Sequence, residues 1–164
     1  MQISTQGLNI IKNFEGLSLS AYRDEAGVWT IGFGSTYYHD GKKVGPGDKL
    51  ANEIQADALM RNTLGQYEDT VNNHVKVPLT QNQFDSLVSF TYNVGTVGFE
   101  ESTLLIKLNE KNYAEAALHF LAWDKITDPK TGKKIVSEIL LQRRREESRL
   151  FLTPDKPAMA AKKI

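Results

Sequence analysis

The chain has 164 residues, of which 40% are apolar and 24% are charged, and its formal net charge is zero. This balance is typical of one compact globular domain and argues against a disordered chain or a fibre. Because the chain contains no cysteine, disulfides, thiolate metal sites and a cysteine nucleophile are excluded, as fits a protein that folds in the cytoplasm.

The charges are unevenly distributed. Residues 1–50 are balanced, residues 51–124 carry a net charge of −6 and residues 125–164 a net charge of +6. The basic segment indicates an anionic partner, and a solvated helix that balances the acidic middle is an equally good interpretation. We expect neither a secretory leader nor a transmembrane segment, because the N-terminus lacks a basic start and no window is apolar enough.

The first part of the chain predicts a helix followed by a small sheet. Apolar side chains recur at helical spacing over residues 4–14, which predicts a short amphipathic helix. Aromatic and β-branched residues are frequent over 17–49, where they are interrupted by turn sequences at 24–27 and 39–42. This texture predicts a small, twisted antiparallel sheet.

The rest of the chain predicts helices. Asn52 with Gln55 is typical of a helix N-cap, and the helix is expected to end near residue 74. Further N-caps are predicted at Thr80 and Asn112, with a surface loop at 128–132 and a final helix over 135–151.

Together these elements predict a single α+β domain over residues 1–164. We expect a small β lobe at about 15–50 and a linking helix at 51–74 that joins it to a larger helical lobe at 75–152. A cleft would lie between the lobes, and residues 153–164 would form a tail.

Two carboxyl groups are the most informative candidate site. Glu15 follows apolar Phe14 at the predicted end of the first helix, where partial desolvation favours a neutral carboxylic acid that can protonate a leaving group. Asp24 lies in a polar turn, where a carboxylate stays ionised. Contrasting carboxyl groups are typical of glycoside hydrolysis, although a glutamate at a helix end and an aspartate in a turn are also ordinary structural features.

The wider pattern resembles the phage lysozymes, glycoside hydrolase family 24. The spacing Glu-x8-Asp-x5-Thr connects Glu15, Asp24 and Thr30, and it lies within the motifs F-E-G, Y-x-D and W-T-I-G-x-G. Further similar segments follow in order over about residues 4–152: Gln83–Phe90, Tyr92–Gly95, Ser102–Leu105, Phe120–Trp123 and Leu141–Glu146.

This resemblance implies a lysozyme-like fold and assigns roles to matching positions. Glu15 would be the general acid, while Asp24 and Thr30 would hold the attacking water. A water attacking opposite the leaving group inverts the anomeric carbon and needs carboxyl groups about 6.5–9.5 Å apart. Tyr92 and Asn93 match positions near the cleft, where Asn93 would hydrogen-bond an N-acetyl group; a capping or core-edge role is an equal alternative.

The arginines and two departures from the family complete the prediction. One of Arg143, Arg144 and Arg145 would pair with Glu15, and helix phase decides which. Ser35 replaces a histidine that is frequent in relatives, and Leu140-Leu141 replaces Gly-Leu, which favours continuous helix there. Gly32-Phe33-Gly34 is interpreted as a strand irregularity, and Trp29 and Trp123 as core residues rather than sugar platforms.

The resemblance predicts a monomeric enzyme that hydrolyses the β-1,4 bond between N-acetylmuramic acid and N-acetylglucosamine in peptidoglycan. We expect no metal or organic cofactor and no nucleic-acid partner. The enzyme would stay in the host cytoplasm until a holin-type pore protein releases it to the wall. Its basic tail would at most touch anionic membrane or lipopolysaccharide. The alternatives are a lytic transglycosylase, which needs only the acid, and a non-catalytic wall-binding virion protein.

Overall fold

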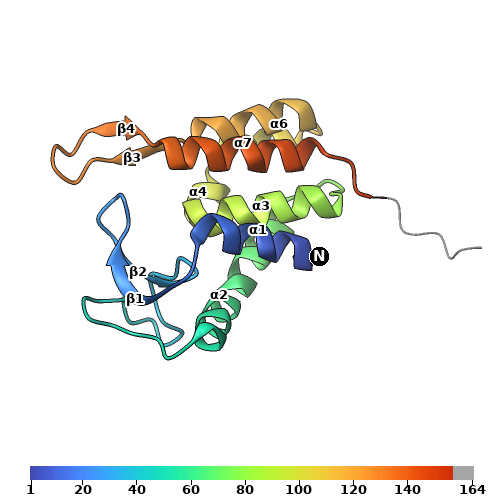
Figure 1. Cartoon of the computed structure of the whole chain (residues 1–164). Helices are drawn as coiled ribbons and strands as arrows, with labels where there is room; N and C mark the ends of the chain where they lie inside the picture. Colours follow the sequence, from blue (N-terminus) through green and yellow to red (C-terminus); the bar gives the residue numbers. More distant parts are fainter. Residues whose placement is uncertain (157–164) are drawn as a thin grey trace, which may run out of the picture.

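The computed structural model describes residues 1–156 and places a small sheet beside a group of helices (Figure 1). The order of the elements is α1 (Thr5–Glu15), β1 (Ser18–Arg23), β2 (Trp29–Gly32), α2 (Glu53–His74), α3 (Gln81–Val94), α4 (Thr96–Glu100), α5 (Thr103–Asn109), α6 (Tyr113–His119), a 3₁₀ turn (Phe120–Ala122), β3 (Lys125–Thr127), β4 (Lys134–Val136) and α7 (Glu138–Leu152). This mixed architecture confirms the predicted fold class. Residues 157–164, most of the predicted basic tail, lie outside the described residues.

Helix α1 is anchored at the end opposite Glu15. The Ser4 hydroxyl caps the helix by accepting a hydrogen bond from Gly7 N at 3.0 Å. Beneath it, the buried carboxylate of Asp85 accepts hydrogen bonds from Ser4 N at 3.0 Å and Gln81 Nε2 at 2.8 Å. A carboxylate is favourable at a helix N-terminus because the free N–H groups there carry partial positive charge. These contacts fix the N-terminal end of α1 against α3, and thereby the place of Glu15 at its C-terminal end.

Strands β1 and β2 form the predicted antiparallel hairpin, in which Tyr22 pairs with Thr30. The second predicted turn is also present: Tyr38 N donates to Lys42 O at 2.9 Å, although the flanking residues make only an isolated bridge. Ile31 is fully buried under α2 and holds the hairpin against that helix. As a result, the β1–β2 turn projects toward the N-terminal end of α7 (Figure 1).

Helix α2 connects the sheet to the other helices. Its N-cap is Asn52, as predicted, with Oδ1 accepting from Gln55 N at 3.0 Å. The Gln55 side chain accepts from Ala51 N, one residue before the N-cap. No helix among residues 1–156 is both long and apolar enough to cross a bilayer.

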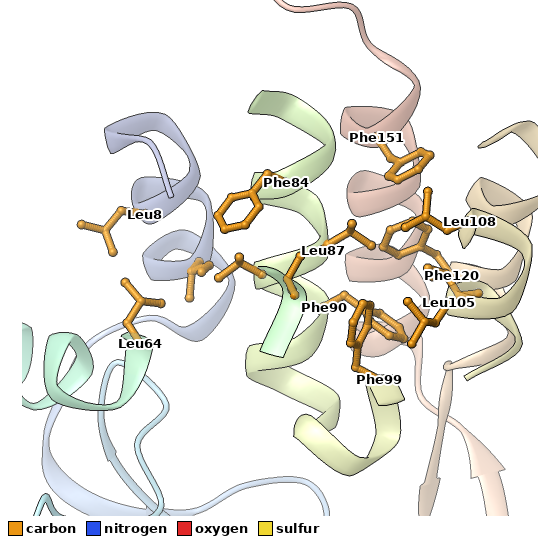
Figure 2. Close-up of a cluster of buried hydrophobic side chains, with 14 of the residues drawn as sticks. Leu8, Leu64, Phe84, Leu87, Phe90, Phe99, Leu105, Leu108, Phe120 and Phe151 are labelled. Carbon is orange, nitrogen blue, oxygen red and sulfur yellow. The ribbon is translucent and has the colours of Figure 1, made fainter. Parts of the chain in front are cut away.

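Helix α3 is the centre of the main core, between α1 on one side and α7 on the other (Figure 1). Its Phe90 meets the rings of Phe99, Phe120 and Trp123 edge-on, with centroids 5.2–6.5 Å apart. The three phenylalanine rings are fully buried, and burial of each contributes about 1.5–3 kcal/mol. Figure 2 shows Phe90, Phe99 and Phe120 among the buried side chains that fill the space between α3, the helices that follow it and α7. The core makes α3 a rigid support for the residues at its C-terminal end.

The structure corrects the prediction for residues 124–137. The final helix begins at Glu138 and not at 135, because Lys134–Val136 pairs with Lys125–Thr127 as a second antiparallel hairpin around the predicted loop. Helix α7 starts where Ser137 Oγ accepts from Leu140 N at 3.1 Å. It runs without a break through Leu140-Leu141, as expected from the absence of glycine there. The short helices α4 and α5 were not predicted.

Candidate active site

Two adjoining cavities form a cleft between the β1–β2 hairpin and the helices. The large cavity is about 590 Å³ and the small one about 310 Å³. The large cavity extends past the β3–β4 hairpin and the start of α7, whereas the small one extends past β2 and α2. The two are joined at a shared border, which is formed by Glu15, Tyr22, Asp24, Asn93 and Val94.

Glu15 is the last residue of α1, and its side chain is 15% exposed. The helix ends here because Gly16 takes a positive φ of 67° and its N–H returns to Lys12 O. One carboxyl oxygen, Oε1, pairs with Nη1 of Arg143. The guanidinium therefore lies in direct contact with the carboxyl group that is predicted to be the acid.

Gly34 lies directly against the Glu15 carboxyl group. Its φ is +83°, and a methyl group added to its Cα would lie 2.5 Å from Glu15 Cδ and 2.9 Å from Cγ. These distances are far below the ordinary carbon contact of about 3.5–4.0 Å. Glycine is therefore needed here for two reasons, its backbone conformation and the close approach of a site residue. The sequence analysis had interpreted it only as a strand irregularity.

Asp24 is held by the backbone of the β1–β2 turn. Its Oδ1 accepts hydrogen bonds from Ala26 N and Val28 N, both at 2.9 Å. The turn therefore fixes the carboxylate orientation. Burial raises the pKa of Tyr22, and the negative charges of Glu15 and Asp24 raise it further. Tyr22 thus lies within the electrostatic reach of both carboxyl groups on the shared border of the cavities.

Thr30 lines the small cavity from β2, opposite Tyr22 in the strand pairing. The residue is 4% exposed, and its hydroxyl donates to Val28 O at 2.9 Å. A hydroxyl has one hydrogen and two acceptor lone pairs. With the hydrogen directed to Val28, the oxygen is available to accept a hydrogen bond from a molecule in the cavity.

Helix phase decides between the three arginines. Arg143 and Arg144 lie on the buried face of α7, whereas Arg145 is exposed. Arg143 reaches Glu15, and its Nη2 donates to Ser89 O at 2.9 Å. Burial opposes its charge, but the carboxylates of Glu147 and Glu15 together raise the pKa of Arg143.

Glu147 was missed by the sequence analysis, yet it holds both arginines. This buried carboxylate accepts from Arg143 Nε at 3.1 Å, contacts Arg144 Nη1 and accepts from Ser89 Oγ at 2.5 Å. Glu147 follows Arg144 by three positions and Arg143 by four, a spacing that places oppositely charged side chains together on a helix and could have indicated these pairs. Such spacing is common on exposed helix faces as well, so it did not distinguish a buried network.

Tyr92 and Asn93 follow one another at the end of α3, and both line the small cavity. The Tyr92 hydroxyl donates to Phe33 O at 2.9 Å, which ties α3 to the glycine-rich loop. Burial and the charge of Glu15 raise the pKa of Tyr92, so its phenol remains a neutral donor. Asn93 is exposed, and its Oδ1 accepts from Arg144 Nη2.

The remaining predicted positions have structural contacts. Trp123 packs on Phe90 with ring centroids 5.6 Å apart, although it also lines the large cavity. Trp29 lies under the Arg23 guanidinium at 5.1 Å. The Ser35 hydroxyl is buried beside the small cavity without a hydrogen-bond partner among residues 1–156. Within those residues no three His, Asp or Glu side chains gather closely enough to hold a metal ion.

Comparison with known proteins gives consistent matches. The family model described as phage lysozyme matches residues 12–147. The endolysin of Salmonella phage P22 is 43% identical over 153 residues, 93% of this chain and 99% of that protein. The solved endolysin of Escherichia coli O157:H7 phage FAHEc1 is 41% identical with a TM-score of 0.85, over 96% of this chain and 98% of the other. The muramidase domain of SpmX from Asticaccaulis excentricus is 39% identical with a TM-score of 0.79, over 93% and 99% of the two chains.

Proposed function

The chain belongs to the phage lysozyme family, and on that premise we propose that it cleaves the β-1,4 bond between N-acetylmuramic acid and N-acetylglucosamine. The endolysins of Acyrthosiphon pisum secondary endosymbiont phage 1 and Salmonella phage P22 are 41% and 43% identical to this chain and are matched over 98% and 99% of their length. The chain shares the function of these endolysins in lysis of the bacterial cell wall. The observation that carries the finer assignment is that Glu15 and Asp24 border one cleft in contrasting surroundings.

Glu15 is proposed as the general acid. When it gives its proton to the glycosidic oxygen, negative charge develops on its carboxyl group. The Arg143 guanidinium is in contact with that group, and Glu147 and Ser89 hold the guanidinium in place. A fixed cation aimed at developing charge stabilises the transition state without reorganisation. In this proposal Arg143 is a positioning and electrostatic partner of the acid.

Asp24 and Thr30 are proposed to hold the attacking water. The Thr30 oxygen is free to accept one of the water hydrogens, since its own hydrogen is bound to Val28 O. Asp24 would accept the other proton as the water attacks, and its carboxylate is kept in place by two backbone N–H groups. Attack from the face opposite the leaving group inverts the anomeric carbon. The proposal is therefore an inverting hydrolysis.

The decisive test is Glu15→Gln, which preserves shape but removes the proton donor. We expect its activity on purified peptidoglycan to fall by about 10²–10⁴-fold, the usual contribution of a general acid, while the circular dichroism spectrum is unchanged. Glu146→Gln, on the exposed face of α7, is the matched control and should keep wild-type activity. A Glu15→Gln enzyme that retains most of its activity would remove this carboxyl group from the mechanism.

A lytic transglycosylase is the nearest alternative, and product analysis separates the two reactions. Hydrolysis adds one water to each cut, whereas a transglycosylase releases an anhydro-sugar, so mass spectrometry of the fragments decides. Proton NMR of the first products would report the anomeric configuration. The presence of Thr30 beside the cavity favours the hydrolase, because a reaction without water has no use for it.

We also propose that the enzyme acts as a monomer and reaches the wall through a holin-type pore protein. Expression in a Gram-negative host with and without a pore protein tests this dependence, because turbidity should fall promptly only when the pore is present.

A non-catalytic wall-binding protein would bind sedimented peptidoglycan but release no soluble sugar.

A further inference from the structure

The side chain of Arg144 is immobilised on every side. It has no exposed surface, its Nε donates to Trp123 O at 2.9 Å, and its guanidinium carbon lies 5.0 Å from the centre of the Phe90 ring. The Nη1 group is paired with Glu147, and the Nη2 group contacts Asn93 at the edge of the cleft. Arg144 therefore presents a fixed hydrogen-bond donor to Asn93.

This fixed donor determines which end of the Asn93 amide faces the cleft. Arginine has only donors, so the atom that it contacts on Asn93 is the carbonyl oxygen Oδ1. The NH₂ group at the other end makes no hydrogen bond with residues 1–156, and the residue is exposed on the shared border of the two cavities. An asparagine is normally able to recognise either a donor or an acceptor by turning its amide, but here that freedom is removed.

We propose that Asn93 is a specificity-determining residue that donates to a carbonyl oxygen of the substrate, and that Arg144 is the positioning residue that sets this polarity. The inference rests on the proposed glycan cleavage and goes beyond it by stating the chemistry that is recognised. Near the cleaved bond, peptidoglycan offers such carbonyl groups from two sources, the acetamides of the sugars and the amides of the peptide stem. Both accept hydrogen bonds, so the experiment must distinguish them.

Asn93→Asp is the informative variant. Aspartate keeps an oxygen for Arg144 and adds an ion pair to it, so the thermal midpoint should not fall; it loses both N–H donors. We expect kcat/KM on soluble peptidoglycan fragments to fall about 10-fold, mostly through KM, as for one hydrogen bond worth about 1.4 kcal/mol. Asn62→Asp, exposed on α2 and lining neither cavity, controls for the added negative charge and should match the wild type.

The substrate is then changed in parallel with the enzyme. Fragments that lack the N-acetyl groups and fragments that lack the peptide stems are each compared with intact fragments. Wild type and Asn93→Asp should have the same kcat/KM on the truncated substrate that lacks the carbonyl bound by Asn93. The truncated substrate on which the 10-fold difference disappears therefore identifies that carbonyl. If the difference persists on both truncated substrates, or is absent on intact fragments, the inference is overturned.

Arg144→Lys tests the positioning role. Lysine keeps the charge but not the planar fork, so the Asn93 amide regains its freedom to turn. We expect a loss of kcat/KM on intact fragments and a smaller loss on the substrate identified above, whereas a purely structural role would reduce activity on both substrates equally. If Arg144→Lys does not fold, the Asn93→Asp comparison still decides whether Asn93 donates. Failure of the wild-type enzyme to cut intact peptidoglycan would instead reject the proposed function itself.

Discussion

Gly34→Ala is expected to inactivate the enzyme through Glu15 rather than through loss of the fold. The added methyl group would overlap the Glu15 carboxyl group, at 2.5 Å from Cδ. Because carbon atoms pack at about 3.5–4.0 Å, the carboxyl group must retreat by about 1 Å. That retreat also moves it relative to the Arg143 guanidinium, which is buried and held by other contacts.

The expected magnitude has two separable parts. A misplacement of about 1 Å in a catalytic group costs about 10²-fold in rate, or about 2.7 kcal/mol. The backbone part is independent of Glu15: alanine in the left-handed region, at the φ of +83° seen here, costs about 1–2 kcal/mol of stability. The assays are peptidoglycan turnover for the first part and urea unfolding for the second.

Gly41→Ala is the matched control for the backbone part. Gly41 has a φ of +87°, and an added methyl group would meet nothing within 4 Å. It should lose the same 1–2 kcal/mol of stability, about the cost of a left-handed alanine, and keep its activity. A second control places Gly34→Ala in a Glu15→Ala background, where the overlap is absent and the stability cost should equal that of Gly41→Ala.

Two results would refute the reasoning. If Gly34→Ala retains activity within about threefold of wild type, which corresponds to less than 1 kcal/mol, the carboxyl group tolerates the methyl and the close approach has no functional weight. If Gly41→Ala loses as much activity as Gly34→Ala, backbone strain alone explains the effect. Either outcome is measured on folded protein, so neither depends on how much material unfolds.

The other predictions concern the buried ion pairs of Glu147, the loss of stability at acid pH through Asp57, and the proposed water site at Thr30. Glu147→Gln leaves Arg143 with one of its two carboxylate partners, and the free energy of unfolding measured in urea should fall by about 3 kcal/mol. A decrease of less than about 1 kcal/mol would mean that the buried ion pairs contribute little to stability. Hydrogen bonds from Lys12 and Arg61 lower the pKa of Asp57 in the folded protein. The ionised Asp57 therefore stabilises the fold fully at a pH above its unfolded pKa of about 3.9, and this stabilisation is lost as the pH falls through the lower folded pKa. Thermal unfolding of Asp57→Asn should therefore be less pH-dependent than wild type in that acid range, and parallel curves would contradict this. Thr30→Val keeps the buried shape but removes the hydroxyl. If the hydroxyl orients the water, kcat should fall about 100-fold, while the free energy of unfolding should change by less than about 1.5 kcal/mol. An unchanged kcat would remove Thr30 from the mechanism.

Helices and turns were predictable wherever the signal is local. Thr80 and Gln83 form the capping box that their spacing predicts, because both partners lie within one helical turn. The same is true of Asp24 and its turn. The start of α7 was wrong by three residues, since residues 134–136 pair with a strand that a helical pattern does not reveal. Short helices such as α4 and α5 carry too few residues for a periodic signal.

The sequence by itself determined the family likeness, the fold class and the order of the candidate residues, because motifs, caps and turns are encoded by neighbours in the chain. Only the tertiary structure decided that Arg143 reaches Glu15 across 128 positions, that Glu147 holds both arginines, and that Gly34 makes room for the acid. These contacts depend on helix phase and on how α1, α3 and α7 pack. Burial converts an ordinary run of charged residues into a fixed network, and burial is a property of the assembled core rather than of any segment.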